Sequence, residues 1–236
     1  MKSKLIDGKL VAKETLEEVK GLLKKGKIAT NALKLSIIQV GNNAASMSYI
    51  NRKVKYGAKV GIKVEVINIT VTESSTDKII DLIEKLNRDK SVTGILVQLP
   101  LPKKLNVDLI LSALSPEKDV DGLTAYNLGR MFMGKDYERL TPCTPIGILK
   151  LLNYYKIDVL SKQVAVIGSS NIVGKPIATM LTNRGATVSI CNSKTIDLSL
   201  YTSKADIVIV AAGRPNLIKA EMIKKGSIIV DVGINR

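Results

Sequence analysis

The feature that most restricts the fold is a regular alternation of short apolar runs with longer amphipathic stretches. In the first half of the chain, the apolar runs have the length of strands and end at turn residues; they occupy residues 33–40, 64–69 and 94–99. The stretches around them repeat apolar side chains at helical spacing; they occupy residues 10–24, 45–60, 77–87 and 107–114. Strands that alternate with helices predict βαβ units and parallel sheets.

The same alternation returns in the second half, after the loop Ser115–Gly122 interrupts it. A helix is predicted from Pro145 to about Lys156, because proline is favoured at the first helical position. Four strands are expected at residues 164–167, 187–191, 207–210 and 228–232. The predicted fold class is therefore α/β, with two open, mainly parallel domains and a cleft between them. Residues 1–122 form the first domain and residues 123–236 a Rossmann-type dinucleotide-binding domain.

Composition excludes several classes of function. The chain has no His, which rules out serine triads and histidine zinc sites, and its two cysteines are far apart, so we expect no metal. The net charge of +15 is dispersed, and one Phe with no Trp leaves few platforms for stacking bases, so we expect no nucleic-acid partner. No apolar run approaches the roughly 20 residues that cross a bilayer, which predicts a cytoplasmic protein with no membrane partner.

A candidate phosphate-binding loop follows the strand that ends at Ile167. Gly168 permits a tight turn, Ser169 and Ser170 offer hydroxyls and amides, and Gly174 allows a helix to pack closely. Ile172 and Val173 lie within the same loop. A helix N-terminus attracts phosphate. The spacing is not GxGxxG, and from this segment alone an ordinary βα turn is equally favoured.

The end of the next predicted strand suggests which dinucleotide binds. About 20 residues after the glycine loop, where NAD enzymes place a carboxylate for the ribose, the sequence reads Cys191-Asn192-Ser193-Lys194-Thr195. Ser193 and Lys194 are donors rather than acids, which favours the 2′-phosphate of NADP, with NAD as the alternative. Gly213 and Ile234 follow two further strands, at the edge of the sheet where cofactors lie.

The first half holds the candidate catalytic residues. Tyr49 and Lys53 are four residues apart and share one helix face. Most lysines are solvated, but in a chain without His a lysine in a partly dry pocket is a credible proton shuttle, because desolvation disfavours its charged form. Gln98, followed by Leu99 and Pro100, could orient that lysine or simply cap the strand.

The interdomain loop supplies two carboxylates, Asp119 and Asp121. Either could accept paired N–H donors from a heterocycle or simply form the turn.

These residues occur in several long motifs that together resemble the methylenetetrahydrofolate dehydrogenase/methenyltetrahydrofolate cyclohydrolase family. The likeness runs from Asp7-Gly8-Lys9 to the last residue. The matching stretches are Ser46–Lys53, Gly94–Pro102, Pro116–Gly122, Pro142–Pro145, Gly168–Pro176 and Asp231–Asn235.

The resemblance implies a role for each candidate. Lys53 is the general acid/base, Gln98 positions it, Asp121 holds the pterin ring and Tyr49 stacks on the aminobenzoate, with Leu99 and Pro100 also at the substrate. The NADP site is lined by Gly168, Ser169, Ser170, Ile172, Val173, Ser193, Lys194, Gly213 and Ile234. The implied reactions are NADP-dependent oxidation of 5,10-methylenetetrahydrofolate and hydrolysis of the methenyl product to 10-formyltetrahydrofolate. The substrates are tetrahydrofolate one-carbon derivatives, and the family is usually homodimeric.

Two departures from the family pattern are evident. Asn192 stands where members commonly carry His, so the preference for NADP rests on Ser193 and Lys194. Members also continue past the position of Arg236 through a Pro-Gly-Gly-Val-Gly-Pro loop and a helix that returns to the first domain. The alternatives are a dehydrogenase without the hydrolytic step and a basic nucleic-acid-binding protein on an inactive dinucleotide fold.

Overall fold

The computed structural model describes residues 5–29 and 32–233, and the chain divides after Ala125 into two compact units. Each unit contains one parallel sheet covered by helices, which confirms the predicted α/β class with two mainly parallel domains.

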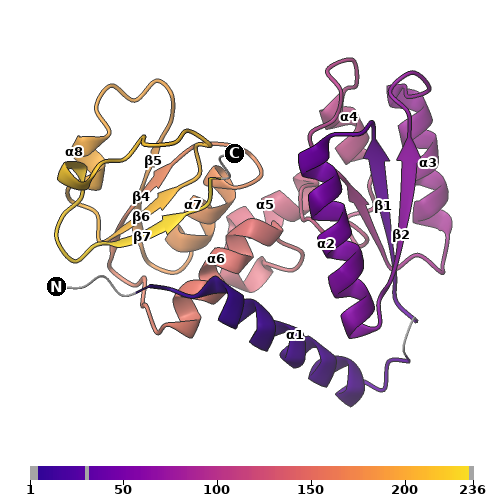
Figure 1. Ribbon diagram of the computed structural model, residues 1–236, viewed down its shortest axis with the longest axis horizontal. Coiled ribbons are helices and arrows are strands. Elements are labelled where there is room, and N and C mark those ends of the chain that lie inside the picture. Colours follow the sequence, from indigo (N-terminus) through magenta and orange to yellow (C-terminus); the bar gives the residue numbers. More distant parts are fainter. Residues whose placement is uncertain (1–4, 30–31, 234–236) are drawn as a thin grey trace. The chain divides into compact units, whose positions relative to one another are not determined.

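Unit 1 is built on a three-stranded sheet of order β2-β1-β3. Its helices are α1 (Gly8–Lys25), α2 (Ala44–Val60), α3 (Thr76–Arg88) and α4 (Val107–Ser112). Its strands are β1 (Lys34–Val40), β2 (Lys63–Ile69) and β3 (Gly94–Val97). Helix α2 covers one face of the sheet, and α3 and α4 cover the other (Figure 1).

Alternation along β1 assigns its side chains to these two faces. Ile37 packs with Ile50 of α2, whereas Ile38 packs with Ile79 and Ile83 of α3. Helix α2 itself has clear local signals at both ends. The Asn43 side chain accepts a hydrogen bond from the Ser46 N–H at its start, and Gly61 takes the left-handed conformation at its end.

The loop 115–122 lies beside β3. The Lys118 ammonium donates to the carbonyls of Leu86, Asn87 and Asp89 at 3.0, 2.8 and 2.7 Å, which caps the C-terminal end of α3. Ile95 forms an isolated parallel bridge with Asp119. A Cβ on Gly94 would lie 2.4 Å from Cγ1 of Val120, so the glycine makes this close approach feasible.

Unit 2 has a four-stranded sheet of order β5-β4-β6-β7. Its strands are β4 (Gln163–Ile167), β5 (Thr187–Cys191), β6 (Ile207–Val210) and β7 (Ile228–Asp231). Its helices are α5 (Ala125–Met133), α6 (Cys143–Tyr154), α7 (Gly174–Thr182) and α8 (Ser199–Thr202), with short 3₁₀ turns η1 (Lys135–Tyr137) and η2 (Ala220–Met222). Buried side chains of α6 and α7 pack on β4 and β6 to form the core.

Three local predictions were wrong. Helix α5 was not expected, because Asn127 and Gly129 weaken the helical signal of a short segment. Helix α6 begins at Cys143, so Pro145 is its third residue; this is tolerated because the first N–H groups of a helix have no partner within it. Strand β3 ends at Val97, so Gln98 lies just beyond the strand that was expected to reach Leu99.

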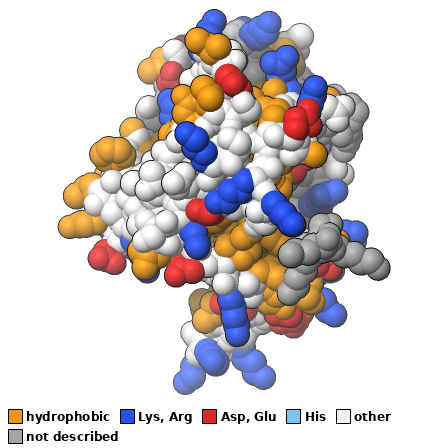
Figure 2. Space-filling model, turned by 90° about the vertical axis from the view of Figure 1, so that its left-hand side faces the viewer, with side chains coloured by type: hydrophobic (Ala, Val, Ile, Leu, Met, Phe, Trp, Pro, Cys, Tyr) orange, Lys and Arg blue, Asp and Glu red, His pale blue; other side chains and the backbone are white. Residues whose placement is uncertain are grey.

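Charged side chains are spread over the surface. On the face shown in Figure 2, Lys and Arg side chains occur over most of the surface, with several gathered at its lower end and acidic side chains between others. Within residues 5–29 and 32–233, no helix combines the length and apolarity needed to span a membrane.

Candidate active site

The order of the strands in unit 1 indicates where a ligand can bind. Strand β2 lies on one side of β1, and the next strand along the chain, β3, lies on the other side. In open α/β sheets, such a reversal opens a crevice at the carboxyl ends of the two central strands. In unit 1 this point lies between the ends of β1 and β3, just before Gly41 and Gln98.

Lys53 and Gln98 meet at this edge of the sheet. The Lys53 Nζ lies 3.2 Å from the Gln98 Oε1, and both side chains are partly buried. The Gln98 Nε2 donates to the carbonyl of Leu99 at 2.8 Å, which turns its oxygen toward the amine. The glutamine side chain therefore joins the lysine and the backbone after the strand. The pair presents a side-chain amine and a neutral carboxamide acceptor at this edge of the sheet.

Tyr49 lies one turn before Lys53 on α2 and is 40% exposed, so its ring can contact a ligand. Leu99 is partly buried and Pro100 is exposed, and a cis peptide bond joins them. Each lies next to the pair in the chain, with Tyr49 one helical turn from Lys53 and Leu99 directly after Gln98.

The two candidate carboxylates have different surroundings. Asp119 is 1% exposed, and its Oδ2 accepts a hydrogen bond from the Thr124 N–H at 2.8 Å, which gives it a structural part in the turn. Asp121 is partly buried and lies two residues beyond the position that pairs with Ile95 of β3. Asp121 lies in the turn that the Gly122 N–H closes on the Asp119 carbonyl at 3.1 Å.

In unit 2 the corresponding reversal lies between β4 and β6, at Gly168. Gly168 has φ +123°, and a Cβ there would lie 2.5 Å from the Ala211 carbonyl oxygen. A Cβ on Gly174 would lie 1.9 Å from the Gly168 carbonyl oxygen. Both glycines are needed for the first turn of α7 to pack against the end of β4.

The loop between these glycines fits a phosphate group. The first turn of α7 contains no acidic residue, so the positive end of the helix dipole is not neutralised there. The Ser170 hydroxyl accepts from the N–H groups of Val173 and Gly174 at 3.2 and 3.4 Å, which orders the loop. Ser169 and Val173 are partly buried, and Ile172 is 44% exposed.

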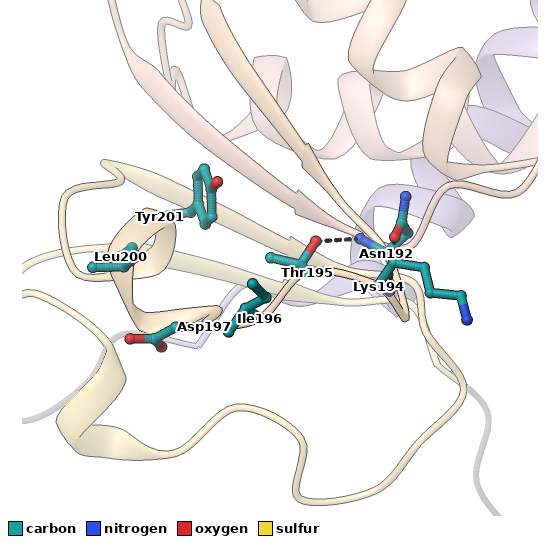
Figure 3. Close-up of a pocket in the computed structure, with 7 residues that line it drawn as sticks. All are labelled: Asn192, Lys194, Thr195, Ile196, Asp197, Leu200 and Tyr201. Carbon is teal, nitrogen blue, oxygen red and sulfur yellow. Dashed lines mark hydrogen bonds between the residues drawn. The ribbon is translucent and has the colours of Figure 1, made fainter.

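A pocket of about 370 Å³ lies beyond the end of β5 (Figure 3). It is lined by Asn192, Lys194, Thr195, Ile196, Asp197, Leu200 and Tyr201. The Asn192 side chain accepts from the Lys194 N–H at 2.9 Å, and the Asn192 N–H donates to the Thr195 hydroxyl at 3.0 Å. These bonds form a compact turn that exposes Ser193 and Lys194.

The sequence analysis had not singled out most of this lining. The available signal was a group of apolar side chains in a loop, since Ile196 and Leu200 are both strongly exposed. Cys191, at the end of β5, is not a reactive group here, because burial raises the pKa of its thiol while a hydrogen bond with Thr195 partly opposes that shift.

Two further predicted residues lie at the ends of β6 and β7. Gly213 has φ +61° and is exposed, and a Cβ on Gly233 would lie 3.5 Å from the Gly213 nitrogen, so the two segments are neighbours. Ile234 lies outside the described residues. No group of three or more Cys, Asp or Glu side chains suited to a metal ion occurs in the described part of the chain.

Family models match both units. Residues 6–121 match the tetrahydrofolate dehydrogenase/cyclohydrolase catalytic domain, and residues 142–236 match the NAD(P)-binding domain of the same family.

Relatives match along nearly the whole chain. The bifunctional protein FolD of Halothermothrix orenii is 44% identical over 99% of this chain and 82% of its own length. The crystal structure of the bifunctional FolD dehydrogenase/cyclohydrolase from Campylobacter jejuni is 48% identical, with a TM-score of 0.91 over 99% of this chain and 82% of that one. A Trypanosoma brucei FolD structure, complexed with NADP cofactor and inhibitor, is 33% identical, with a TM-score of 0.85 over 97% of this chain and 76% of that one.

Proposed function

The chain belongs to the tetrahydrofolate dehydrogenase/cyclohydrolase family, and from this premise we propose that Lys53, held by Gln98, is the proton acceptor of a bifunctional enzyme. The enzyme oxidises 5,10-methylenetetrahydrofolate to 5,10-methenyltetrahydrofolate with NADP and hydrolyses the product to 10-formyltetrahydrofolate. The observation that carries the assignment of the residue is the 3.2 Å contact between the Lys53 amine and the Gln98 amide oxygen.

The oxidation depends mainly on orientation. NADP, when bound, would supply the hydride acceptor for the methylene carbon, and this oxidation releases no proton for the protein to accept. The contribution of the protein is to hold the folate, for which we propose Tyr49 against the aminobenzoate, Asp121 on the pterin ring, and Leu99 and Pro100 as apolar contacts. Holding two reactants in the correct geometry removes much of the entropic part of the barrier.

The hydrolysis needs a base. A water oxygen bonds to the cationic methenyl carbon and gives one proton to the Lys53 amine, which accepts it in its unprotonated form. The N5–carbon bond then breaks as the hydroxyl becomes the formyl carbonyl; its proton is lost and N5 gains one. A side chain that accepts a proton in such a transition state typically contributes about 10²- to 10⁴-fold. Gln98 orients the amine and accepts from it once it is charged.

For the cofactor, we propose that the Gly168–Gly174 loop binds the pyrophosphate and that Ser193 and Lys194 bind the 2′-phosphate. The close approach of Gly174 to Gly168, and the helix start without an acidic residue, support the first assignment. The exposed turn at Asn192 supports the second, since it leaves Lys194 at the pocket directly after β5, while the pocket's carboxylate, Asp197, accepts hydrogen bonds from the N–H and hydroxyl of Ser199. Ile172, Val173, Gly213 and Ile234 complete the proposed lining.

We further propose a cytoplasmic homodimer with no nucleic-acid or membrane partner. The dispersed positive charges support the lack of a nucleic-acid partner. An exposed edge strand supports self-association, because β5 pairs only with β4 in its sheet and Ile190 on it is 46% exposed. Sedimentation velocity at micromolar concentration should give a two-chain species, and a single-chain mass would contradict the dimer.

The alternative is a dehydrogenase that has lost the hydrolytic step. A silkworm protein described as a 5,10-methylenetetrahydrofolate dehydrogenase is 37% identical to this chain, with a TM-score of 0.92 over 100% of this chain and 84% of that one. The Lys53–Gln98 pair favours the bifunctional form, because oxidation alone does not require a proton acceptor.

The test compares two lysines of α2. Lys53→Met removes the acceptor but keeps the aliphatic length, and Lys55→Met, at an exposed position of the same helix, is the control. Hydrolysis is followed by the loss of methenyl absorbance and oxidation by the appearance of NADPH. We expect Lys53→Met to slow hydrolysis by about 10²-fold or more while the control stays within about twofold. Hydrolysis by Lys53→Met at the parent rate would refute the assignment.

A further inference from the structure

A second glutamine lies beside the candidate catalytic pair, on β1. Gln39 is two residues beyond Ile37, so strand alternation places it on the face covered by α2. Ile38 pairs with Val97, and the Gln98 N–H donates to the Ile38 carbonyl at 2.9 Å, so Gln39 and Gln98 occupy adjacent positions on neighbouring strands. Adjacent strands are about 4.8 Å apart. Gln39 and Gln98 therefore flank the point where the strand order reverses.

The carboxamide of Gln39 is buried, and among the described residues only its NH₂ group forms a hydrogen bond. Its side chain is 2% exposed, and its Nε2 donates to the Gly41 carbonyl at 2.9 Å. Its Oε1 is fully buried and has no hydrogen-bond partner among the described residues. Buried amide oxygens in native proteins nearly always accept a hydrogen bond, because leaving one unpaired costs free energy. A donor is therefore expected to reach this oxygen in some state of the enzyme.

Gln39 repeats the arrangement of Gln98. In both residues the NH₂ group donates to a backbone carbonyl shortly after the residue, at 2.9 Å for Gln39 and 2.8 Å for Gln98. This bond fixes which way each oxygen faces. The Gln98 oxygen receives the Lys53 amine, whereas the Gln39 oxygen, one strand away on the same face, receives no described donor.

Lys53 has unused donors. Its ammonium form carries three N–H groups, and the structure gives it one hydrogen bond, the 3.2 Å contact with Gln98. A charge-assisted bond is usually shorter, about 2.7–2.9 Å, and the rotatable bonds of the four-carbon lysine stem allow the amine to approach a second acceptor. When the amine gains a proton, it needs a further acceptor.

We propose that Gln39 is a positioning residue of the hydrolytic step and supplies a second carboxamide acceptor for the charged amine of Lys53. This inference rests on the proposed role of Lys53. In the proposed arrangement, the amine bridges Gln98 and Gln39 after it takes the proton from the attacking water. Gln39 thereby stabilises the product of that proton transfer and turns the amine toward the substrate.

The test uses two substitutions at Gln39 and one at Asn68, the residue beside Gln39 on β2. Gln39→Met keeps the size but has no acceptor, and Gln39→Glu keeps an acceptor oxygen. Asn68 lies on β2 in register with Gln39 and is exposed. Its side chain is the other amide near Gln39, so Asn68→Ala tests whether Asn68, and not Lys53, donates to the Gln39 oxygen. Both activities and the melting temperature are measured for each variant.

We expect Gln39→Met to lower kcat for methenyl hydrolysis about tenfold, with KM for the methenyl substrate and kcat for oxidation within about threefold. Gln39→Glu should recover hydrolysis to within about threefold of the parent, and Asn68→Ala should leave it unchanged. A purely structural role would instead lower both activities together and would not be rescued by glutamate. Hydrolysis at the parent rate in Gln39→Met, equal loss of both activities, or the same loss in Asn68→Ala would overturn the proposal.

A spectroscopic measurement tests the same contact without a substitution at Gln39, so it does not depend on whether those variants fold. The side-chain ¹⁵N–¹H resonances of Gln39, assigned in the 236-residue chain and followed over a pH titration, should move as the amine of Lys53 gains its proton in the parent and in Lys55→Met, and should not show that movement in Lys53→Met. Unmoved resonances would overturn the proposal. If Lys53→Met abolishes hydrolysis while Gln39→Met does not, the proposed function stands and only the role of Gln39 fails.

Discussion

Replacing Gly174 by alanine should disrupt both the nucleotide loop and the stability of unit 2. The added Cβ would lie 1.9 Å from the Gly168 carbonyl oxygen and 2.6 Å from its carbonyl carbon. Ordinary carbon–oxygen contacts are about 3.3 Å or longer, so the backbones must separate by more than about 1 Å.

The structure leaves little room for that movement. Gly168 donates its N–H to the Cys191 carbonyl at 2.8 Å, and the Ala211 carbonyl blocks its other side. Gly174 is itself buried, and α7 continues into the buried residues Pro176 and Ile177. Overpacking of this kind costs about 3 kcal/mol, at the upper end of the usual range, which lowers the melting temperature of a 236-residue chain by about 6–12 °C. A displaced loop should also raise KM for NADP by at least about tenfold.

Stability is measured by urea unfolding that is monitored by circular dichroism, and KM for NADP is measured by steady-state kinetics. The matched control is Gly147→Ala on the exposed side of α6, where a Cβ would meet nothing within 4 Å. This control should be stabilised by about 0.5–1 kcal/mol, the usual helical advantage of alanine over glycine. If Gly174→Ala unfolds within about 0.5 kcal/mol of the parent and keeps the same KM for NADP, the argument from backbone contact is wrong.

Two other predictions concern unit 2. The Lys224 ammonium, and next the Gln163 backbone N–H, hold the pKa of Asp206 below its usual range. This stabilisation is present above the unfolded pKa and is lost as pH falls through the lowered folded pKa, so the parent should lose more stability than Asp206→Asn between pH 6 and pH 3, as measured by urea midpoints. Separately, Lys194→Met should raise KM for NADP about tenfold and KM for NAD less than twofold, because only NADP carries the 2′-phosphate; equal effects in steady-state assays would contradict this role.

Most of the fold could be predicted from the sequence, because strand and helix patterns depend on residues only a few positions apart. The segments 33–40 and 64–69 read as strands, and β1 and β2 lie there. Helix α5 could not be recognised in this way, since its stability comes from Met131, which is buried in the core of unit 2.

The candidate site was predictable only in part. Lys53 and Gln98 stood out as an amine and an amide at positions that face a ligand. For each, an ordinary structural role remained open: a solvated lysine and a strand cap. Gln39 was not singled out, because one polar residue inside an apolar strand has no distinct sequence signal. Its meaning depends on which face it occupies and which strand lies next to it.

By itself, the sequence determined the chemical inventory and the order of the elements. With no His, a lysine amine is the natural proton acceptor, and alternating periodicities require parallel βαβ units. Only the tertiary structure decided which groups meet. Lys53 and Gln98 are 45 residues apart, and the register of β1 and β3 with α2 packed on them brings their atoms to 3.2 Å. Periodicity is a property of neighbouring residues, whereas such a contact depends on how distant strands pair and pack.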